Sequence, residues 1–477
     1  MKLKIQNKIN KMASNTFIKK QWFIIGFSVF IFSFTITGCS KFVEIDPPRN
    51  FLISKTVFND PATVKSALAS IYYKMREQGL VSGRYGLSTV MGIYSDELNY
   101  YKFNTDYQEY YGHSVIASNK IISDWWSHAY NIIYASNDII KGITNSESLT
   151  LEDQEHFLGQ ALFIRAYIHS LLVTIYGDIP YISTTNYTKN NVVSRMPEDV
   201  VYDNIITDLL QAVLLLEDSD TNSEHVVPDK AVATALLARM YLYTEQWELA
   251  EETSSVLINN YQLESDITKV FLKGSPETLW QFKPNGITEK NTYESSQFII
   301  QAIPGQTYAL SQNIMDAFEP NDLRLLNWVG TKTSSDGLTT LPFAYKYKET
   351  INTTSESLEY SIIFRLAEQY FIRAESRTHL GNFIGAQDDL NSIRYRAGLA
   401  STPANSKEEL LEAILHERQV ELFTELGHRW FDLKRMGLAD EVLSPIKPNW
   451  KPTDILLPLP ETELEKNANL KPQNSGY

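Results

Sequence analysis

The stretch at 228–258, PDKAVATALLARMYLYTEQWELAEETSSVLI, decides how the chain is built, because its pattern returns at 359–393, EYSIIFRLAEQYFIRAESRTHLGNFIGAQDDLNSI. In each stretch an alanine is followed nine residues later by an aromatic residue, and three residues further on by a second alanine. The two sets are Ala238, Trp247, Ala250 and Ala374, Phe383, Ala386. Small side chains let two helices approach closely where they cross, and the aromatic side chain fills the turn between them. Each stretch is therefore predicted to form a pair of packed helices.

The spacing resembles that of the tetratricopeptide helix pair, whose small residues recur at the same twelve-residue interval. Further helices are predicted by apolar residues at helical spacing and by three capping signals, namely Asp60 before Pro61, Thr150 before Asp153, and Ser406 before Glu409. Their expected ranges are 59–78, 123–143, 150–177, 197–218 and 406–426, the last stopping at Gly427. We predict a mostly α fold in which tetratricopeptide-like helix pairs form a superhelical scaffold.

Residues 261–358 differ in composition from the helical parts on either side. They are rich in Thr, Ser, Asn, Gly and Pro, with short apolar runs such as ETLWQF, so we expect long loops, small strands and one or two short helices. The C-terminal stretch 454–477 contains several prolines and is expected to be irregular and docked on the surface. We interpret 57–477 as a single body with an N-terminal helical part (57–260), this loop-rich insertion and a C-terminal helical part (359–477).

The first 38 residues have the pattern of a secretory signal peptide. Six lysines lie within residues 1–20, no acidic residue occurs before Glu44, and an uncharged apolar run occupies 22–38. This run of 17 residues is short for a helix that must cross the hydrocarbon of a membrane, which needs about 20. We therefore expect residues 1–38 to be removed.

Cys39 is the only cysteine in the chain, and it follows Ile36, Thr37 and Gly38 directly after the apolar run. It has no partner for a disulfide and forms no C-x-x-C motif. The stretch resembles the bacterial lipobox, so we predict that Cys39 carries lipid and that 39–56 is an extended tether. A single acyl chain anchors only marginally, so stable attachment needs more than one. The alternatives are a small buried residue or the last turn of a membrane anchor.

The charge of the chain argues against nucleic-acid binding. Residues 1–38 contain six of the 43 basic residues and none of the 57 acidic ones, so the chain that follows them has a formal charge of −20. Binding to phosphate backbones, and electrostatic adhesion to anionic lipid, depend on basic patches. We therefore exclude nucleic acid as a partner and expect the lipid itself to attach the protein to a membrane.

A candidate binding segment lies at 93–111, IYSDELNYYKFNTDYQEYY, where seven of nineteen residues are aromatic. Helical periodicity is poor across 99–106, which indicates a loop. Sugars present an apolar face and a rim of hydroxyl groups, so a site for them needs flat aromatic rings and side chains that hydrogen-bond in fixed directions. The candidates are Tyr100, Tyr101, Phe103 and Asn104. The alternative is that the tyrosines only pack the loop onto the first helices.

The middle region offers a second candidate set, formed by Tyr293, Tyr308, Trp328 and Tyr345 with Arg324 and Asn327 nearby. From this set we predict Tyr293 and Trp328 as ligand-binding residues, the alternative for Trp328 being part of a short hydrophobic core. Other tryptophans are interpreted as structural: Trp247 by its place in the repeat, and at least one of Trp125 and Trp126.

The charged residues of 417–437, ERQVELFTELGHRWFDLKRMG, are interpreted as structural. Arginines and carboxylates at helical spacing hold neighbouring helices together and neutralise each other's charges. The residues of this kind in the stretch are Glu417, Arg418, Glu421, Arg429, Asp432 and Arg435. Arg165 and Arg373 are interpreted in the same way. No two of the eight histidines are three or four residues apart, so the sequence has no helical metal pair. G-x-S-x-G, P-loop and G-x-G-x-x-G motifs are also absent. We expect no catalytic residue, no metal site and no cofactor.

Five stretches together resemble the SusD/RagB family of outer-membrane nutrient-binding lipoproteins from Bacteroidetes-type bacteria. They are WWSHAYNIIYASNDII (125–140), GQALFIRAYIHSLLVTIYGDIPYI (159–182), YDNIITDLLQAV (202–213), the charged motif at 417–437, and LLPLPETELEKNANLKPQNSGY (456–477). The resemblance runs from Cys39 to Tyr477. The chain has NSGY where the family more often has NPGY, and ELGHRW where EGxRW is usual; neither departure falls on a position that carries chemistry.

The resemblance implies a non-enzymatic surface protein with tetratricopeptide-like helices as scaffold and long loops that carry the ligand site. It further implies lipid anchoring in the outer membrane with the body facing the cell exterior, and a SusC-like TonB-dependent transporter as the partner to which captured oligosaccharide is delivered. The alternatives are a peptide-import receptor of the same fold, a surface glycoside hydrolase using two carboxylates in one cleft, and an assembly scaffold in which the 93–111 aromatics are buried.

Overall fold

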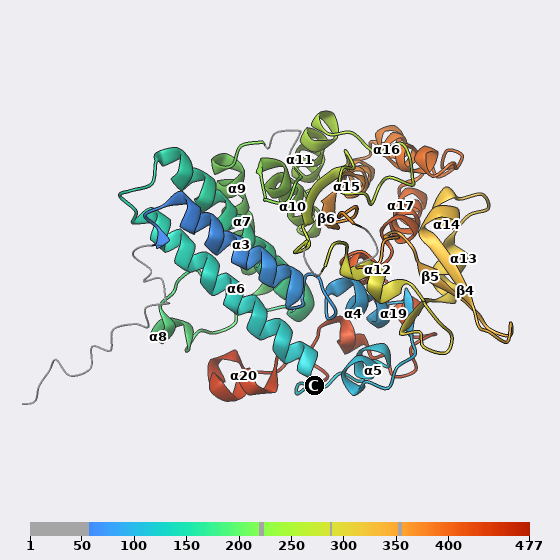
Figure 1. Ribbon diagram of the computed structural model, residues 1–477, viewed down its shortest axis with the longest axis horizontal. Coiled ribbons are helices and arrows are strands. Elements are labelled where there is room, and N and C mark those ends of the chain that lie inside the picture. Colours follow the sequence, from blue (N-terminus) through green and yellow to red (C-terminus); the bar gives the residue numbers. More distant parts are fainter. Residues whose placement is uncertain (1–56, 219–223, 287–288, 352–354) are drawn as a thin grey trace, which may run out of the picture. The chain divides into compact units, whose positions relative to one another are not determined.

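The structure is a computed structural model and describes residues 57–477 except 219–223, 287–288 and 352–354 (Figure 1). The predicted signal peptide, Cys39 and the tether up to residue 56 lie outside the described residues. Helices account for 54% of the residues and strands for 7%, which confirms the predicted mostly α fold.

Four long helices build the N-terminal part, and each lies close to the range predicted for it. They are α3 (Pro61–Glu77), α6 (Lys120–Thr144), α7 (Leu151–Tyr176) and α9 (Glu198–Leu215). The predicted caps are confirmed, because Asp60 accepts a hydrogen bond from the Ala62 amide and Thr150 from the Asp153 amide. The helix α7 packs against both α6 and α9 (Figure 1).

Among the described residues, α7 is the one helix long and apolar enough to cross a membrane. The most apolar 18 residues of this helix are 94% buried inside the protein. The helix ends at Gly177, which has a positive φ of 72°. Central helices of soluble bodies have this same composition, and α7 is such a core helix.

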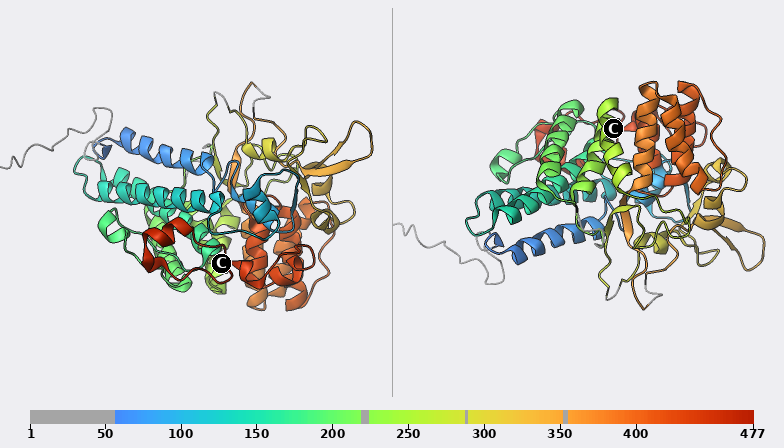
Figure 2. Two further views of the ribbon diagram at one scale, coloured as in Figure 1. Left: turned by 90° about the horizontal axis from the view of Figure 1, so that it is seen from below. Right: turned by 90° about the horizontal axis from the view of Figure 1, so that it is seen from above.

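The two predicted helix pairs are present and lie against each other, as Figure 2 shows in green and orange. The first pair is α10 (Lys230–Tyr243) and α11 (Trp247–Asn260), and the second is α15 (Leu366–His379) and α16 (Phe383–Arg396). All four alanines of the repeat have no exposed surface. The Trp247 ring stacks on His379 with centroids 3.8 Å apart, which joins the two pairs.

The next helix, α17 (Lys407–Leu422), opens with the predicted capping box of Ser406 and Glu409. It ends four residues earlier than predicted, and Gly427 instead precedes α18 (His428–Arg435) in a left-handed conformation with φ of 73°. Glycine suits this position for two reasons: other residues rarely adopt such a φ, and an added Cβ would lie 2.8 Å from the Met91 Cβ.

The middle region contains more regular structure than expected. Its described strands form antiparallel pairs with each other or with strands outside the region: β3 (Tyr308–Leu310) with β1 (Leu98–Tyr100), β2 (Thr278–Phe282) with β6 (Ser361–Arg365), and β4 (Val329–Thr333) with β5 (Thr340–Ala344). Three short helices accompany them, where one or two were expected: α12 (Tyr293–Phe298), α13 (Gln312–Ala317) and α14 (Leu323–Trp328).

The remaining short elements are α4 (Leu87–Tyr94), α5 (Thr105–Tyr111), α8 (Tyr187–Asn190), α19 (Ala439–Leu443), η1 (Pro452–Ile455), α20 (Glu461–Lys466) and η2 (Ala468–Leu470). The C-terminal stretch is thus less irregular than predicted. It is attached to the end of α7 by two hydrogen bonds. The side-chain amide of Asn474 donates to the Tyr176 carbonyl at 2.8 Å, and the backbone amide of Leu457 donates to the Ile175 carbonyl at 3.0 Å.

The charged motif is structural, as its helical spacing indicated. Its arginines form ion pairs, with distances measured from a guanidinium nitrogen to a carboxylate oxygen. The pairs are Arg418 with Asp432 at 2.7 Å, Arg435 with Glu375 at 2.5 Å, and the buried Arg429 with Asp96 at 2.8 Å. The same holds outside the motif, with ion pairs at 2.6 Å between Arg165 and Asp208 and between Arg373 and Asp389. Buried charges require such partners, so these side chains stabilise the helix contacts.

Candidate functional site

The pairing of β1 with β3 brings the 93–111 segment against the middle region. Leu98 lies opposite Leu310 and Tyr100 opposite Tyr308, and the Tyr101 amide extends the ladder by donating to the Thr307 carbonyl at 3.0 Å. Two aromatic segments that are about 200 positions apart in the chain therefore meet at one place.

The segment predicted as a loop at 99–106 is a loop only at 101–104, because its first two residues end β1 and its last two begin α5. The Asn104 side chain caps α5 by accepting a hydrogen bond from the Tyr107 amide at 3.2 Å. Tyr107 is in turn held by its hydroxyl group, which donates to the Arg84 carbonyl at 2.7 Å. These contacts hold the α5 end of the short connection at 101–104, which we call the 101–104 turn.

Around this turn, four aromatic side chains that retain solvent exposure form what we call the aromatic surface: Tyr85, Tyr100, Tyr101 and Phe103. Phe103 is 95% exposed, and Tyr85 and Tyr101 are each 38% exposed. Beneath them the buried Tyr107 stacks on Tyr85 and on Tyr100, with centroids 5.7 and 5.5 Å apart. A ligand or partner that covers the Phe103 ring would remove its apolar surface from water, which is favourable in free energy.

Polar groups border the aromatic surface. The Asn104 amide oxygen serves as the helix cap, while its amide nitrogen makes no hydrogen bond to the described part of the chain. Lys102 donates to the Gly305 carbonyl at 2.8 Å, which ties the turn to the 301–307 loop. Burial raises the pKa of the Tyr100 and Tyr101 hydroxyl groups, so both remain protonated donors at neutral pH. Exposed rings and directional donors are thus close together in the chain at 100–104.

The charged residues beneath β1 support this turn from inside the protein. Glu97 is buried and accepts a hydrogen bond from the Thr424 amide at 3.1 Å. Burial, and secondarily the neighbouring Asp96, raise the pKa of Glu97 to about 8. Asp96 itself is paired with Arg429. The start of β1 is therefore attached to α18 and to the segment that precedes it.

The prediction that Trp328 binds ligand is wrong, because its ring has no accessible face. It is 1% exposed, its indole nitrogen donates to the Ile267 carbonyl at 2.9 Å, and its ring packs on Phe271 with centroids 5.2 Å apart. The alternative interpretation, part of a hydrophobic core, is the one that the structure supports.

The rest of the second set does not gather at one site. Tyr308 is 2% exposed and packs on Tyr100 with centroids 5.8 Å apart, so it supports the aromatic surface from below. Tyr293 is half-buried and its hydroxyl group lies between Glu77 and Glu289, at 2.8 and 2.7 Å. Ligand binding by Tyr293 stays a prediction.

Tyr85 is the member of the aromatic surface that the sequence reasoning missed. It lies two residues after Gly83 and directly before Gly86, in a turn that ends where α4 begins. An aromatic residue between two glycines has no helix or strand face to pack on, and this signal could have identified it as exposed.

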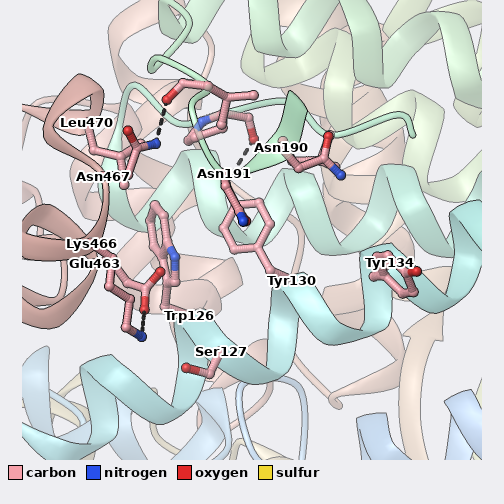
Figure 3. A pocket seen from close by; sticks show the side chains of 13 residues that line it. Trp126, Ser127, Tyr130, Tyr134, Asn190, Asn191, Glu463, Lys466, Asn467 and Leu470 are labelled. Carbon is pink, nitrogen blue, oxygen red and sulfur yellow. Dashed lines mark hydrogen bonds and ion pairs between the residues drawn. The ribbon is translucent and has the colours of Figure 1, made fainter. Parts of the chain in front are cut away.

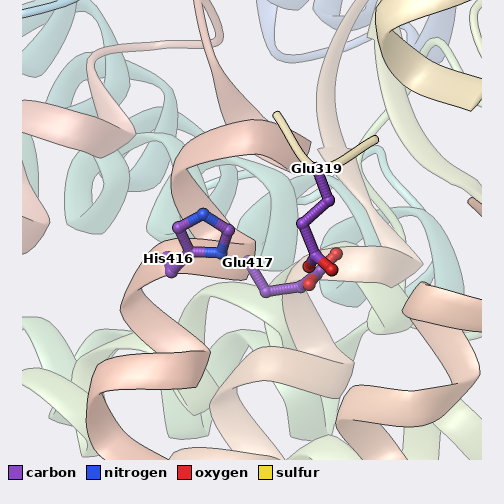
Figure 4. A group of neighbouring side chains, drawn as sticks. All are labelled: Glu319, His416 and Glu417. Atoms are coloured by element: carbon purple, nitrogen blue, oxygen red, sulfur yellow. The ribbon is translucent and has the colours of Figure 1, made fainter. Parts of the chain in front are cut away.

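Glu319, His416 and Glu417 lie together (Figure 4), and their possible ligand atoms are all within 4.8 Å of one another. Arg394 already contacts both carboxylates, at 2.5 Å for Glu319 and 2.9 Å for Glu417. The His416 Nε2 lies 2.8 Å from the Ala317 carbonyl. A cation would have to compete with the guanidinium group, so these residues are better explained as an ion-pair network than as a metal site.

Comparison with known families gave two matches that together account for most of the chain. A family model described as the SusD family matches residues 258–477, and one described as "Starch-binding associating with outer membrane" matches residues 41–242. SusD-like protein P2 of Formosa agariphila is 28% identical, over 93% of this chain and 97% of the relative. SusD-like protein P25 of the same organism is 23% identical over the same shares.

Solved structures share the fold. A SusD superfamily protein from Bacteroides vulgatus superposes with a TM-score of 0.79 at 22% identity, covering 88% of this chain and all of that one. Surface glycan-binding protein A from Bacteroides fluxus gives a TM-score of 0.70 at 22% identity, covering 87% and 99%. A laminarin binding SusD-like protein gives 0.73 at 20% identity with the same coverage. The predicted tetratricopeptide-like architecture is confirmed by these likenesses.

Proposed function

The chain belongs to the SusD family of non-catalytic binding proteins, and on this premise we propose that it captures glycan at the cell surface and delivers it to a SusC-like TonB-dependent transporter. The observation that carries the proposal is the aromatic surface, above all the almost fully exposed Phe103 beside Tyr101 and Asn104. The names of solved relatives, one glycan-binding and one laminarin-binding, are consistent with the same class of ligand.

Capture would depend on the two kinds of group that border the 101–104 turn. The C–H face of a sugar ring would lie on Phe103 and Tyr101, and its hydroxyl groups would accept from the free Asn104 amide nitrogen and exchange hydrogen bonds with the tyrosine hydroxyls. Each aromatic contact contributes only about 0.5–1.5 kcal/mol beyond area burial. Such a site binds weakly enough to release its ligand, as delivery to a transporter requires.

The test is a glycan array with titration calorimetry on a soluble form that begins after Cys39, since residues 54–477 form one compact unit. We expect the double variant Tyr101→Ala/Phe103→Ala to bind the selected glycan at least about tenfold more weakly. The matched control is Tyr395→Ala, which removes a tyrosine that is 59% exposed on α16.

Equal affinities for the double variant and the wild type would exclude the aromatic surface as the capture site. Binding of mixed peptides, with no glycan bound, would favour peptide import by the same fold. The two short strands β4 and β5 form a separate hairpin that offers backbone groups for that mode of recognition.

Membrane attachment and the partner belong to the same proposal. The basic and apolar N-terminal residues and the Ile36–Cys39 stretch support lipid attachment at Cys39, and one matching family is described as associating with the outer membrane. A SusC-like transporter partner follows from the family, and would be tested by co-purification from outer membranes solubilised in mild detergent.

A further inference from the structure

A second site of a different kind lies between α6 and the C-terminal helix α20 (Figure 3). It is a pocket of about 470 Å³, within the range of volumes common for small-molecule sites. Trp126, Tyr130 and Tyr134 follow one another at four-residue spacing on α6, so they share one face of that helix. The opposite side is lined by the ends of α8 and α20.

Trp126 carries a donor that the protein leaves unused. The side chain is 4% exposed and packs on Tyr130 and Tyr176, with centroids 4.8 and 5.3 Å apart. Its indole nitrogen makes no hydrogen bond within the described part of the chain, whereas those of the buried Trp125 and Trp328 each donate to a carbonyl. The nitrogen itself keeps some accessible surface, so water or a ligand can reach it. Since Trp126 lines the pocket, a ligand there could supply the acceptor.

The walls of the pocket are held in place by hydrogen bonds. The side-chain amide of Asn467 donates to the Val193 carbonyl at 2.8 Å, and this hydrogen bond joins the end of α20 to the segment after α8. The Tyr130 hydroxyl donates to the Pro180 carbonyl at 2.9 Å, which fixes the plane of that ring. A site with fixed walls loses little conformational entropy when a ligand binds.

The chemistry of the lining indicates the ligand. Tyr134 is 48% exposed and offers part of a ring to the opening, and Asn191 adds an exposed amide. The charged lining residues, Glu463 and Lys466, form an ion pair at 2.8 Å and leave no net charge. Aromatic rings, an unused donor, an amide and zero net charge suit a neutral molecule that has both C–H faces and hydroxyl groups.

We propose that this pocket binds one or two sugar units of a neutral saccharide, as a second carbohydrate site apart from the aromatic surface. The proposal extends the proposed function from one site to two, and it requires only that saccharides of this class are ligands. A polysaccharide long enough to reach both sites would bind more tightly than either site does alone, by raising the effective concentration at the second site.

The test uses the soluble form with four neutral trisaccharides, namely maltotriose, laminaritriose, mannotriose and cellotriose, at millimolar concentration. Binding is measured by calorimetry and by saturation-transfer NMR. The aromatic surface is first removed with Tyr101→Ala/Phe103→Ala. Ser127→Phe is then added, because Ser127 is an exposed pocket residue on α6 and a phenyl ring there would fill the opening. The matched control is Lys141→Phe, at an exposed position on the same helix, 14 residues beyond Ser127 and outside the lining.

We expect at least one trisaccharide to bind the double variant, and we expect Ser127→Phe, but not Lys141→Phe, to weaken this binding at least about tenfold. Unchanged binding after Ser127→Phe would overturn the second site. So would binding to the wild type that is lost completely in the double variant, an outcome that leaves the aromatic surface as the capture site. If none of the four trisaccharides binds even the wild type, the second site is rejected; the glycan array separately decides the proposed function.

Discussion

Arg324 shows, at the scale of single residues, why the many charged side chains of this protein do not form a catalytic centre. Its guanidinium group has no exposed surface and lies 2.6 Å from Glu417 and 3.1 Å from Glu421. Burial by itself would raise the pKa of Glu421, but the neighbouring arginines, led by Arg396, hold it well below its usual range. An acid kept ionised by several arginines cannot act as a proton donor, so these carboxylates stabilise the fold.

Glu97 differs, because burial raises its pKa to about 8 from an ordinary value of 4.5. The folded protein therefore retains a proton that the unfolded chain has released at intermediate pH. The contribution of Glu97 to the free energy of unfolding is fully present below pH 4.5. It decreases as the pH rises from 4.5 through 8, where the folded protein also loses the proton. We predict that Glu97→Gln is close to neutral at pH 4.5 and stabilises the protein by about 4–5 kcal/mol at pH 8.5, relative to the wild type at each pH.

Urea unfolding of the variant and the wild type across this range measures the effect as the difference in the free energy of unfolding. Glu465→Gln, which changes an exposed acid on α20, corrects for the general effect of removing one negative charge. A difference for Glu97→Gln that does not grow with pH would show that the buried carboxyl is ionised throughout.

Single residues also show how far the sequence could predict the site. Phe103 and Tyr101 lie in a short segment crowded with aromatic and amide side chains, and this density pointed to them directly. Trp328 lies in the middle region that the sequence marks as rich in loops, yet it is buried against Phe271. The contact that buries it joins parts of the chain about 57 positions apart, and local composition carries no information on such a contact.

At the scale of elements, the repeat alanines decide how closely the helix pairs approach. Ala374 has no exposed surface and lies on α15, which packs against both α11 and α16. We predict that Ala374→Leu lowers the free energy of unfolding by about 1–3 kcal/mol, because the added carbons must force the helices apart. Denaturant unfolding followed by circular dichroism measures this.

Ala69→Leu on α3 serves as the control, since that alanine is exposed and leucine is nearly as good a helix former. Equal stabilities for the two variants would mean that the crossing of α15 over its neighbours has room for a larger side chain. The interpretation of the repeat as a packing device would then fail.

The helices were predictable because each carries its own signals. Apolar spacing and the caps Asp60, Thr150 and Ser406 are local, and the observed bounds follow them within a few residues, except for the early end of α17. The pairing of β1 with β3 was not predictable. These strands have three residues each, and their pairing is stabilised by long-range contacts such as that of Tyr100 with Tyr308.

For the whole molecule, the question is what holds an acidic protein at a membrane. The chain after residue 38 has a formal charge of −20, so anionic lipid would repel it. The apolar helix α7 is committed to the core and cannot serve as a membrane span without unfolding the body. The lipid proposed for Cys39 would attach the protein without either of these contributions.

We predict that Cys39→Ser moves the protein, expressed in a bacterium with the lipoprotein pathway, from the outer-membrane fraction to the soluble fraction. Cell fractionation followed by immunoblotting measures this, with Ser40→Ala as the control at the next position. The glycan affinity of the purified variant should equal that of the wild type, because residues 54–477 form a compact unit without the N-terminal segment. A Cys39→Ser protein that stays with the membrane would mean that the apolar run at 22–38 is retained as the anchor, and lipid attachment would have to be abandoned.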